Sequence, residues 1–513
     1  MKRRKIKINL SILVSTILVL ACTNLEVEPT DSVFNEADTG GFGGVNAQSN
    51  LNNLYNDVYG QLGDQANFFA LNEVSTDEML VPTRGTDWGD NGIWRTLHTH
   101  TWDPQHLYIL NVWNNLNQNV YRASEIIDSR SSPTAQQKAE AQFLRAFSMF
   151  FVLDLYGQVP FRGLDDGPNI NPAVMTKQEA YDFIVSDLTE AIPNLPSLGP
   201  GADGLSKATQ AAGRFLLAKV MMNGERYTGN AANYTEVIDL IDAIAGDGYA
   251  LQDGYFEIFT EEADSETIWW ASTSVGNRIW NGMHYHIVAP DNTGGGWNGF
   301  STLAEFYDLF EGDPDSNYVG DGQEERRGWV PDASNADEVN LGIGYGFLIG
   351  QMYDASGVPL KDRPGNPLVF TKEIPGLAGN NERTGIRTIK YHPAGERSFN
   401  SHEIVFRYAD AHLLKAEAIL RNGGDPTALV NELRTLRKAT PLGTVTAQDL
   451  IDERGRELYK EFWRRNDLVR FGQYTKDWEF KDPSSVGDDT KNYFPIPTNA
   501  LLSNPNLVQN PGY

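Results

Sequence analysis

Tryptophans in a polar, turn-rich segment are the residues of this sequence best suited to bind a ligand by contact. Residues 75–102 (STDEMLVPTRGTDWGDNGIWRTLHTHTW) place Trp88, Trp94 and Trp102 among Asp, Asn and Arg. An indole stacks on the apolar face of a ring, and carboxylate, amide and guanidinium groups hydrogen-bond its polar edge. The DWGDNG turn predicts that Trp88 lies outside the core. Trp94 either joins this surface, at the start of an extended segment, or packs between helices; Trp102 is expected to pack.

Two later segments have a similar composition and lie in a region, about 250–400, that is rich in Gly, Asn, Asp and Pro. Residues 277–299 (NRIWNGMHYHIVAPDNTGGGWNG) surround a tryptophan with glycines, which allow close backbone approach. Residues 383–391 (RTGIRTIKY) offer cationic and hydroxyl edges. Loops held on a rigid scaffold commonly carry binding sites. The candidate contact residues that these three segments supply by composition are Trp88, Trp94, Trp280, Trp297, Asn298 and Arg387.

Motifs for catalysis, metals or cofactors are weak or missing. Asp313, Asp315, Asn317 and Glu324 match positions 1, 3, 5 and 12 of a calcium loop, but position 6 is Tyr318 instead of the glycine that the loop requires. Asp-Pro at the start of this stretch also fits a plain turn. The sequence has no phosphate-binding loop, no nucleophile elbow and no dinucleotide-binding glycine motif after a strand. We therefore expect no cofactor and no catalytic residue, and treat calcium as a weak candidate.

The N-terminus has the pattern of an export signal. Residues 1–21 combine five cations with an apolar run, shorter than the roughly 20 residues of a membrane-spanning helix. The run ends in VLAC, which resembles a bacterial lipobox and marks Cys22, the only cysteine, for lipidation. Two or more acyl chains would anchor the mature chain stably. Residues 22–41 are acidic and are expected to form a tether.

The charge excludes one class of partner. Loss of residues 1–21 would take the net charge from −26 to −31. Nucleic-acid binding needs clustered Lys and Arg, so no nucleic acid is expected as a partner. A polyanionic ligand is disfavoured for the same reason.

Helical periodicity dominates both ends of the chain and predicts a mostly α-helical fold. We expect a helical N-terminal half over 42–250 and a C-terminal half over 251–513 with a loop-rich insertion at 251–400. Alanine-rich helix pairs resemble tetratricopeptide-type hairpins. The helices expected from spacing and capping lie at about 44–63, 103–130, 132–156, 175–194, 206–224, 232–247, 401–422, 426–438 and 446–470.

Three groups of motifs, in order, resemble the SusD/RagB family. The first is AEAQFLRA (139–146), continuing to YGQVP (156–160). The second joins RYADAHLLKAEA (407–418) to DERGREL (452–458) and RRNDLVRFG (464–472). The third is the terminus, with YFPIP (493–497) and QNPGY (509–513). Asp410 stands where the family more often has Glu.

Glu and Arg alternate at helical spacing through 453–465, which predicts ion pairs of Glu453 with Arg456, and of Glu461 with Arg464 and Arg465. Arginines beside these carboxylates would keep them ionised, so a structural role is expected for them.

The resemblance implies a surface-exposed outer-membrane lipoprotein that captures a polysaccharide or oligosaccharide. It implies a partner too, a SusC-like TonB-dependent transporter beneath the binding protein. It adds Asp77 to the candidate contacts, with Trp94. Tryptophan-rich loops with few clustered cations favour a neutral glycan, for which we prefer a β-glucan to a fructan. A surface glycoside hydrolase, or a peptide-binding protein of the RagB type, remains as an alternative.

Overall fold

The computed structural model describes residues 41–167, 169–260, 262–288, 294–391 and 402–513. The expected signal segment, Cys22 and almost all of the expected tether lie outside these ranges. Residues Gly43–Tyr513 form one compact unit. None of the helices in the described ranges combines the length and hydropathy of a membrane-spanning segment.

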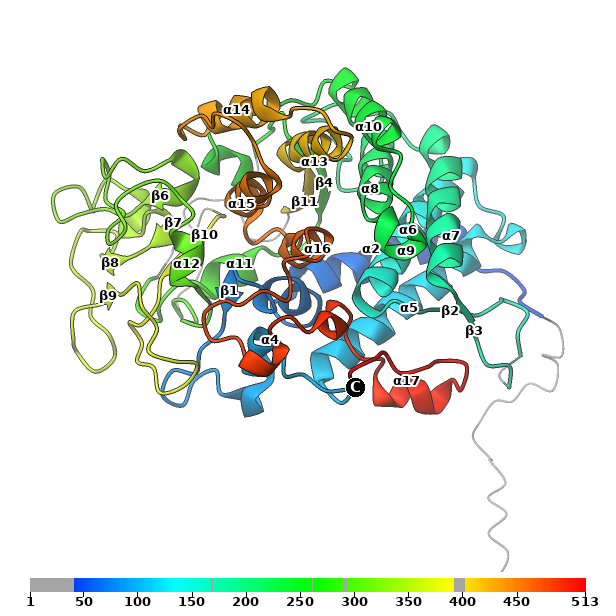
Figure 1. The fold of residues 1–513 in the computed structure, drawn as a ribbon, viewed down its shortest axis with the longest axis horizontal. Coiled ribbons are helices and arrows are strands. Elements are labelled where there is room, and N and C mark those ends of the chain that lie inside the picture. Colours follow the sequence, from blue (N-terminus) through cyan, green and yellow to red (C-terminus); the bar gives the residue numbers. More distant parts are fainter. Residues whose placement is uncertain (1–40, 168, 261, 289–293, 392–401) are drawn as a thin grey trace, which may run out of the picture. The chain divides into compact units, whose positions relative to one another are not determined.

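The prediction of a mostly α-helical fold is confirmed (Figure 1). The helices are α2 (Ala47–Gly63), α3 (Asn67–Phe69), α4 (Ile93–Thr99), α5 (Leu107–Ile127), α6 (Ala135–Tyr156), α7 (Lys177–Ala191), α8 (Gln210–Met222), α9 (Gly224–Thr228), α10 (Tyr234–Gly246), α11 (Gly276–Trp280), α12 (Ala304–Tyr307), α13 (Tyr408–Arg421), α14 (Thr427–Leu436), α15 (Ala447–Leu458), α16 (Arg464–Arg470) and α17 (Thr498–Ser503).

The strands are short and pair two or three at a time. They are β1 (Met79–Leu80), β2 (Val159–Phe161), β3 (Ala173–Met175), β4 (Thr267–Ala271), β5 (Ser301–Thr302), β6 (Gly328–Trp329), β7 (Tyr345–Leu348), β8 (Gly350–Gln351), β9 (Val369–Phe370), β10 (Arg387–Ile389) and β11 (Glu403–Arg407). The described pairings are β1–β5, β2–β3, β4–β11, β8–β9 and the order β10–β7–β6.

Local signals account for where the main helices begin and end. Thr134, Thr176 and Thr446 each form a reciprocal capping box with the residue three positions on, at the start of α6, α7 and α15. Helix α6 ends at Gly157, which adopts the left-handed conformation (φ 69°) that glycine accepts without strain. These caps hydrogen-bond backbone groups that have no partner inside the helix.

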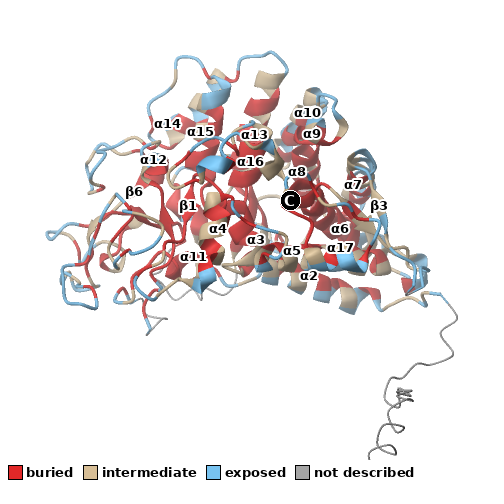
Figure 2. Ribbon diagram, turned by 60° about the horizontal axis from the view of Figure 1, so that its bottom comes forward, coloured by how far each residue is buried: buried red, intermediate tan, exposed pale blue. Residues whose placement is uncertain are grey.

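Helix α6 lies at the centre of the helical packing. It packs against α5 and α7, and α8 packs against α10. Every residue of α6 from Ala139 to Tyr156 is buried, and Figure 2 shows burial concentrated along α6 and α8. Trp269 of β4 packs against Phe147 of α6 and Phe406 of β11, which joins the N-terminal and C-terminal halves in one core.

Two predicted helices are shorter than expected because tertiary pairing interrupts them. The stretch expected to be helical over 401–422 is strand β11 at Glu403–Arg407, where it pairs antiparallel with β4. The stretch 446–470 breaks into α15 and α16, and Lys460 and Phe462 between them have positive φ. The backbone N–H of Lys460 donates to the Glu78 carboxylate at 2.6 Å, which holds this break.

The break between α15 and α16 also redirects the expected ion pairs. Glu453 pairs with Arg456 at 2.6 Å, as predicted. The expected pairs of Glu461 are wrong, because it contacts Lys390 at 2.5 Å and Arg407 at 2.7 Å instead. Past the turn, Arg464 pairs with Asp77 and Arg465 with Asp154, both at 2.7 Å.

The carboxylate of Glu457 is the centre of a buried charge cluster. It pairs with Arg407 at 2.7 Å, Arg437 at 3.0 Å and Arg326 at 3.3 Å, and these four side chains are 0 % exposed. Burial would raise the pKa of Glu457, but the three arginines outweigh it and lower the pKa. Removal of one member of such a cluster leaves uncompensated buried charge.

We predict that Glu457→Gln lowers the free energy of unfolding by about 3–5 kcal/mol, because three buried guanidinium groups lose their shared anion. The matched control is Asp242→Asn, which breaks an exposed ion pair with Lys415 and is expected to change stability by less than about 1 kcal/mol. Urea unfolding of both variants measures the difference. Equal effects of the two substitutions would contradict a special role for the buried cluster.

Candidate functional site

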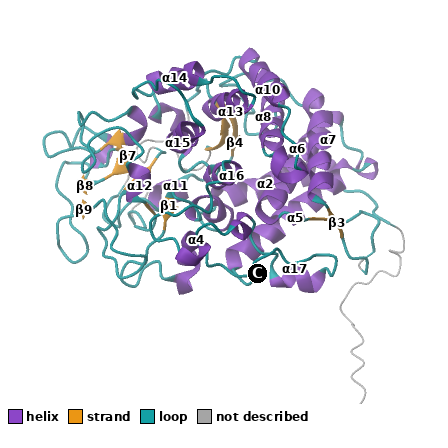
Figure 3. Cartoon of the chain, in the orientation of Figure 1, coloured by secondary structure: helices purple, strands orange, loops and turns teal. Residues whose placement is uncertain are grey.

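Antiparallel pairing of β1, in the first candidate segment, with β5 (Ser301–Thr302), which closely follows the second, brings these two segments together. Met79 lies opposite Thr302 and Leu80 opposite Ser301. Arg84, buried after β1, donates to the carbonyl of Thr384 at 2.6 Å and to the hydroxyl of Ser301 at 2.7 Å. The three segments that were chosen by composition therefore meet in one place, among loops that lie away from α6, α7 and α10 (Figure 3).

Trp88 and Trp297 form the aromatic part of this site. The indole N–H of Trp88 donates to the backbone carbonyl of Trp297 at 2.8 Å. Trp88 is half-buried and packs edge-on against Phe300, with ring centroids 5.7 Å apart. Trp297 is 38 % exposed, which is unusual for so large an apolar side chain. We call this pair of tryptophans the ledge.

The backbone that presents the ledge adopts conformations that non-glycine residues rarely occupy. Trp88, Asp90 and Asn91 have φ of 58°, 36° and 52°, and Asn298 has φ of 52°. A bulky residue such as Trp88 at positive φ is a genuine outlier. Strain of this kind costs on the order of 1–3 kcal/mol per residue and is typically found at ligand-binding sites.

Glycines make room for the ledge, as the GGGWNG pattern predicted. A Cβ atom on Gly299 would lie 2.5 Å from Cε2 of Trp88, and one on Gly296 would collide with the backbone of Met283. The Trp88 ring therefore occupies the space that any other residue at 299 would need.

A charged edge lies beside the ledge. Asp87 accepts hydrogen bonds from the hydroxyl of Tyr285 at 2.8 Å and from Arg363 at 2.5 Å. The Arg363 guanidinium lies 4.1 Å from the centre of the Tyr285 ring and also pairs with Glu382. His284 hydrogen-bonds the other oxygen of Glu382 at 2.9 Å.

Arg363 keeps both carboxylates of this edge ionised. Burial would raise the pKa of Asp87, but hydrogen bonds from Tyr285 and Arg363 lower it overall. The pKa of Glu382 is lowered in the same way, against burial, by Arg363 and His284. Burial lowers the pKa of His284 to about 4, so this imidazole is neutral at pH 7. The edge can hydrogen-bond hydroxyl groups, but neither carboxylate holds a proton to donate as a general acid near neutrality.

The turn after Trp88 contributes to a neighbouring cavity of about 590 Å³. Asp90 and Asn91 line it together with His106, which directly precedes α5, and Tyr108, which lies within α5. The ledge and this cavity share one loop, so the surface available to a ligand extends on from Trp88.

The structure corrects the predicted roles of three contact residues. Asp77 is 5 % exposed, and its carboxylate accepts hydrogen bonds from Nε and from a terminal nitrogen of Arg464, at 2.7 and 2.8 Å. Trp94 is 2 % exposed and lies in α4, not in an extended segment; its indole donates to Asp90 at 2.8 Å. Trp280 is 7 % exposed. We remove these residues from the contact set, because a buried side chain offers a ligand no face.

Asn298 and Arg387, also predicted as contacts, support the ledge from within. Both are 0 % exposed. Arg387 donates to the amide oxygen of Asn298 at 2.9 Å and to the Glu382 carbonyl at 3.0 Å. Their role is to hold the Trp297 loop in its strained conformation, and of the predicted contacts only Trp88 and Trp297 reach the surface.

The weak calcium candidate is not assembled. Glu324 is buried against Arg326, whose Nε donates to it at 2.8 Å. The Asn317 side-chain amide donates to the Phe347 carbonyl at 2.8 Å, and Arg327 occupies the Asp313 carbonyl. Asp313 and Asp315 are exposed. The described residues contain no cluster of three or more His, Cys, Asp or Glu side chains able to hold a metal ion.

Sequence reasoning missed Arg363 and Glu382, which complete the edge. They come from parts of the loop-rich region that no motif marks, and only the fold brings them to Asp87. A usable signal did exist for the strained positions: Asn-Gly follows the first tryptophan closely at 91–92 and the second directly at 298–299. Asn-Gly marks positions of positive φ.

Comparison with known families and proteins gives consistent matches. The model described as "SusD family" matches residues 265–513, and that described as "Starch-binding associating with outer membrane" matches 24–222. The Starch-binding protein SusD of Bacteroides thetaiotaomicron is 29 % identical over 497 residues, which covers 88 % of this chain and 86 % of SusD.

Solved structures show the same fold at low identity. A SusD-like protein from Bacteroides fragilis superposes with a TM-score of 0.69 at 19 % identity, over 91 % of this chain and 96 % of that one. Surface glycan-binding protein A from Bacteroides thetaiotaomicron, in complex with laminarihexaose, gives a TM-score of 0.62 at 18 % identity, over 90 % and 98 %.

We predict that Gly299→Ala displaces the Trp88 ring and lowers stability by about 1–3 kcal/mol, because the new methyl group overlaps the indole. In ¹⁵N-tryptophan NMR spectra, the indole N–H resonance of Trp88, assigned through Trp88→Phe, should shift. Gly443→Ala is the control, since its Cβ would meet nothing within 4 Å. An unchanged Trp88 resonance in Gly299→Ala would contradict the packing described.

Proposed function

Since this chain belongs to the SusD/RagB family, we propose that it binds a neutral glycan at the cell surface and does not cleave it. The observation that carries the proposal is the exposed indole of Trp297 beside Trp88, on strained backbone next to a hydroxyl-binding edge. Sugar rings have apolar faces and hydroxyl edges, which fit an indole and an Asp–Arg–Tyr edge respectively.

The electrostatics of the edge support binding over hydrolysis. A glycoside hydrolase needs two carboxyl groups, one of which holds a proton at the working pH. Arg363 lowers the pKa of Glu382 and contributes to lowering that of Asp87, so both are bases and neither is an acid at pH 7. The same Arg363 is satisfied by those two carboxylates, which removes the cation that a uronate would need.

Glucans are the specific ligands proposed. The related SusD is by name a starch-binding protein, and a structural neighbour is described as a laminarin-binding SusD-like protein. Starch is an α-glucan and laminarin a β-glucan; of the two we propose a β-glucan as the ligand. In keeping with the family, we propose a SusC-like TonB-dependent transporter as partner and a lipid anchor at Cys22.

We predict that Trp297→Ala weakens glycan binding at least tenfold, which corresponds to about 1.4 kcal/mol, because the exposed stacking face is lost. Affinity electrophoresis of residues 23–513 against laminarin, amylose, a fructan and a uronate polymer measures it. Trp297→Phe should retain part of the affinity, and Leu502→Ala, at an apolar residue that is 80 % exposed, is the control.

Retardation by one neutral glycan, lost in Trp297→Ala and kept in the control, supports the proposal. If the folded protein binds none of these polymers, glycan capture is wrong and peptide becomes the leading ligand. Reducing ends released from a bound glycan would show hydrolysis and contradict the proposal of binding alone.

We predict that Cys22→Ala releases the protein from the outer membrane, because the thioether-linked chains that anchor it cannot form. Fractionation should find the wild type with outer membranes and the variant in the soluble fraction. Cross-linking of the wild type in cells should recover the proposed transporter. A variant that stays with the membrane as firmly as the wild type would show that Cys22 is not the anchor.

A further inference from the structure

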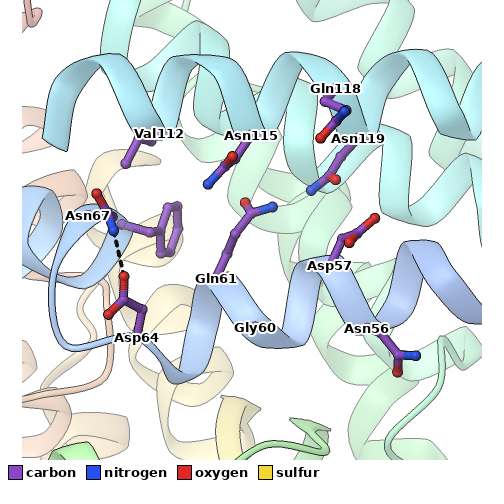
Figure 4. A pocket seen from close by; sticks show the side chains of 11 residues that line it. Asn56, Asp57, Gly60, Gln61, Asp64, Asn67, Val112, Asn115, Gln118 and Asn119 are labelled. Atoms are coloured by element: carbon purple, nitrogen blue, oxygen red, sulfur yellow. Dashed lines mark hydrogen bonds between the residues drawn. The ribbon is translucent and has the colours of Figure 1, made fainter. Parts of the chain in front are cut away.

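A cavity of about 280 Å³ lies between α2 and α5, apart from the ledge, and amide side chains line most of it. Helix α2 contributes Asn56, Gln61 and Gly60, and α5 contributes Asn115, Gln118 and Asn119. Figure 4 shows the side chains of Gln61, Asn115 and Asn119 pointing into the space between the two helices. The apolar side chains of both helices face the core, and these amides lie on the adjacent sides of the two helices.

The first sign of an absent ligand is the state of Asn119. This residue is 1 % exposed, and its amide nitrogen has no hydrogen-bond partner among the described residues. An unsatisfied buried donor costs about 1–3 kcal/mol, so the Asn119 amide calls for a hydrogen-bonding occupant of the cavity.

The second sign is Gly60, an exposed residue in the last turn of α2, where alanine is the better helix former. A Cβ on Gly60 would meet nothing within 4 Å, so no packing contact requires glycine at this position. Its absent side chain widens the cavity, which is the one local effect that the structure shows for it.

The charges around the cavity favour an uncharged ligand. Asp57 is paired with Arg122, and Asp64 accepts from Asn67 at 2.6 Å. The remaining polar groups are amides, which both donate and accept hydrogen bonds. Hydroxyl groups also do both, whereas an anion would find no available cation in the lining. A volume just below the range of drug-sized pockets suits a ligand of one or two small rings.

We propose that this amide-lined cavity is a second binding site, for a small neutral polyhydroxylated molecule such as a hexose or the end of an oligosaccharide. Asn119 forms its floor, and Gln61, Asn115 and Gln118 hydrogen-bond the outer hydroxyls. No residue of the ledge lines this cavity, so the second site can be tested independently of the proposed function.

The test is saturation-transfer NMR of the purified protein with D-glucose, and with D-glucuronate as the anionic counterpart. Glucose should bind, and glucuronate should bind at least tenfold more weakly. Gly60→Trp fills the cavity from a position where nothing obstructs the side chain, and should abolish the glucose signal. Gly60→Ala, which keeps the opening and raises helix propensity, should preserve it.

A second variant guards against a folding defect in Gly60→Trp. Asn115→Ala/Gln118→Ala alters only residues that are half-buried or exposed, and should weaken glucose at least tenfold with unchanged melting temperature. Trp297→Ala should leave glucose binding at the cavity intact.

Three results would overturn the proposal. The first is the absence of a glucose signal in the wild type. The second is a signal that is lost in Trp297→Ala but kept in Gly60→Trp. The third is a crystal soaked in glucose whose cavity holds water alone. The second result would assign the sugar to the ledge and leave the proposed function standing.

Discussion

The buried carboxylate of Glu457 is the constraint on which the arrangement of the C-terminal half depends. Three guanidinium groups from three separate segments converge on it: Arg326 before β6, Arg407 at the end of β11 and Arg437 at the end of α14. Charges taken fully out of water are tolerated only when every partner is in place. The cluster therefore specifies the positions of these segments more than it adds stability, since an apolar core of equal volume could be as stable.

Buried arginines also hold the loops around the ledge, but their partners there are neutral oxygens instead of carboxylates. Arg84 and Arg387 are fully buried, and their hydrogen bonds go to carbonyl, hydroxyl and amide oxygens of the loops around Ser301 and Thr384. Burial lowers the pKa of Arg84 to about 9, which still leaves it charged at pH 7. Each guanidinium donates to several loop carbonyls at once and so ties together segments that have no regular secondary structure.

The sequence predicted the helical scaffold well because periodicity and capping are local properties. Leu51, Leu54 and Val58 of α2 lie on the buried stripe that their spacing indicated. It predicted the site poorly because exposure is a tertiary property. Trp94 and Trp297 have similar polar neighbours in the sequence, yet one is sealed beneath Trp88 and Phe300 and the other faces solvent.

Arg387 shows the same limit for charged residues. An arginine side chain could hydrogen-bond a ligand, but Arg387 points inward and donates to Asn298 and to loop carbonyls instead. The side chain that does form the edge, Arg363, lies in a loop whose composition resembles that of many others. Their places in the fold separate the two: Arg387 lies buried in β10 opposite Leu348 of β7, whereas Arg363 is exposed and reaches Asp87, which lies far from it in the sequence.

Rigid loops decide what kind of binding the ledge can offer. Strained φ values at Trp88, Asp90 and Asn298 persist only because the surroundings over-determine them, here through the Trp88–Trp297 hydrogen bond and the Arg387 contacts. A surface fixed in this way loses little conformational entropy when a ligand arrives. For the glycan binding that we propose at the ledge, the ordering penalty would therefore fall mainly on the ligand.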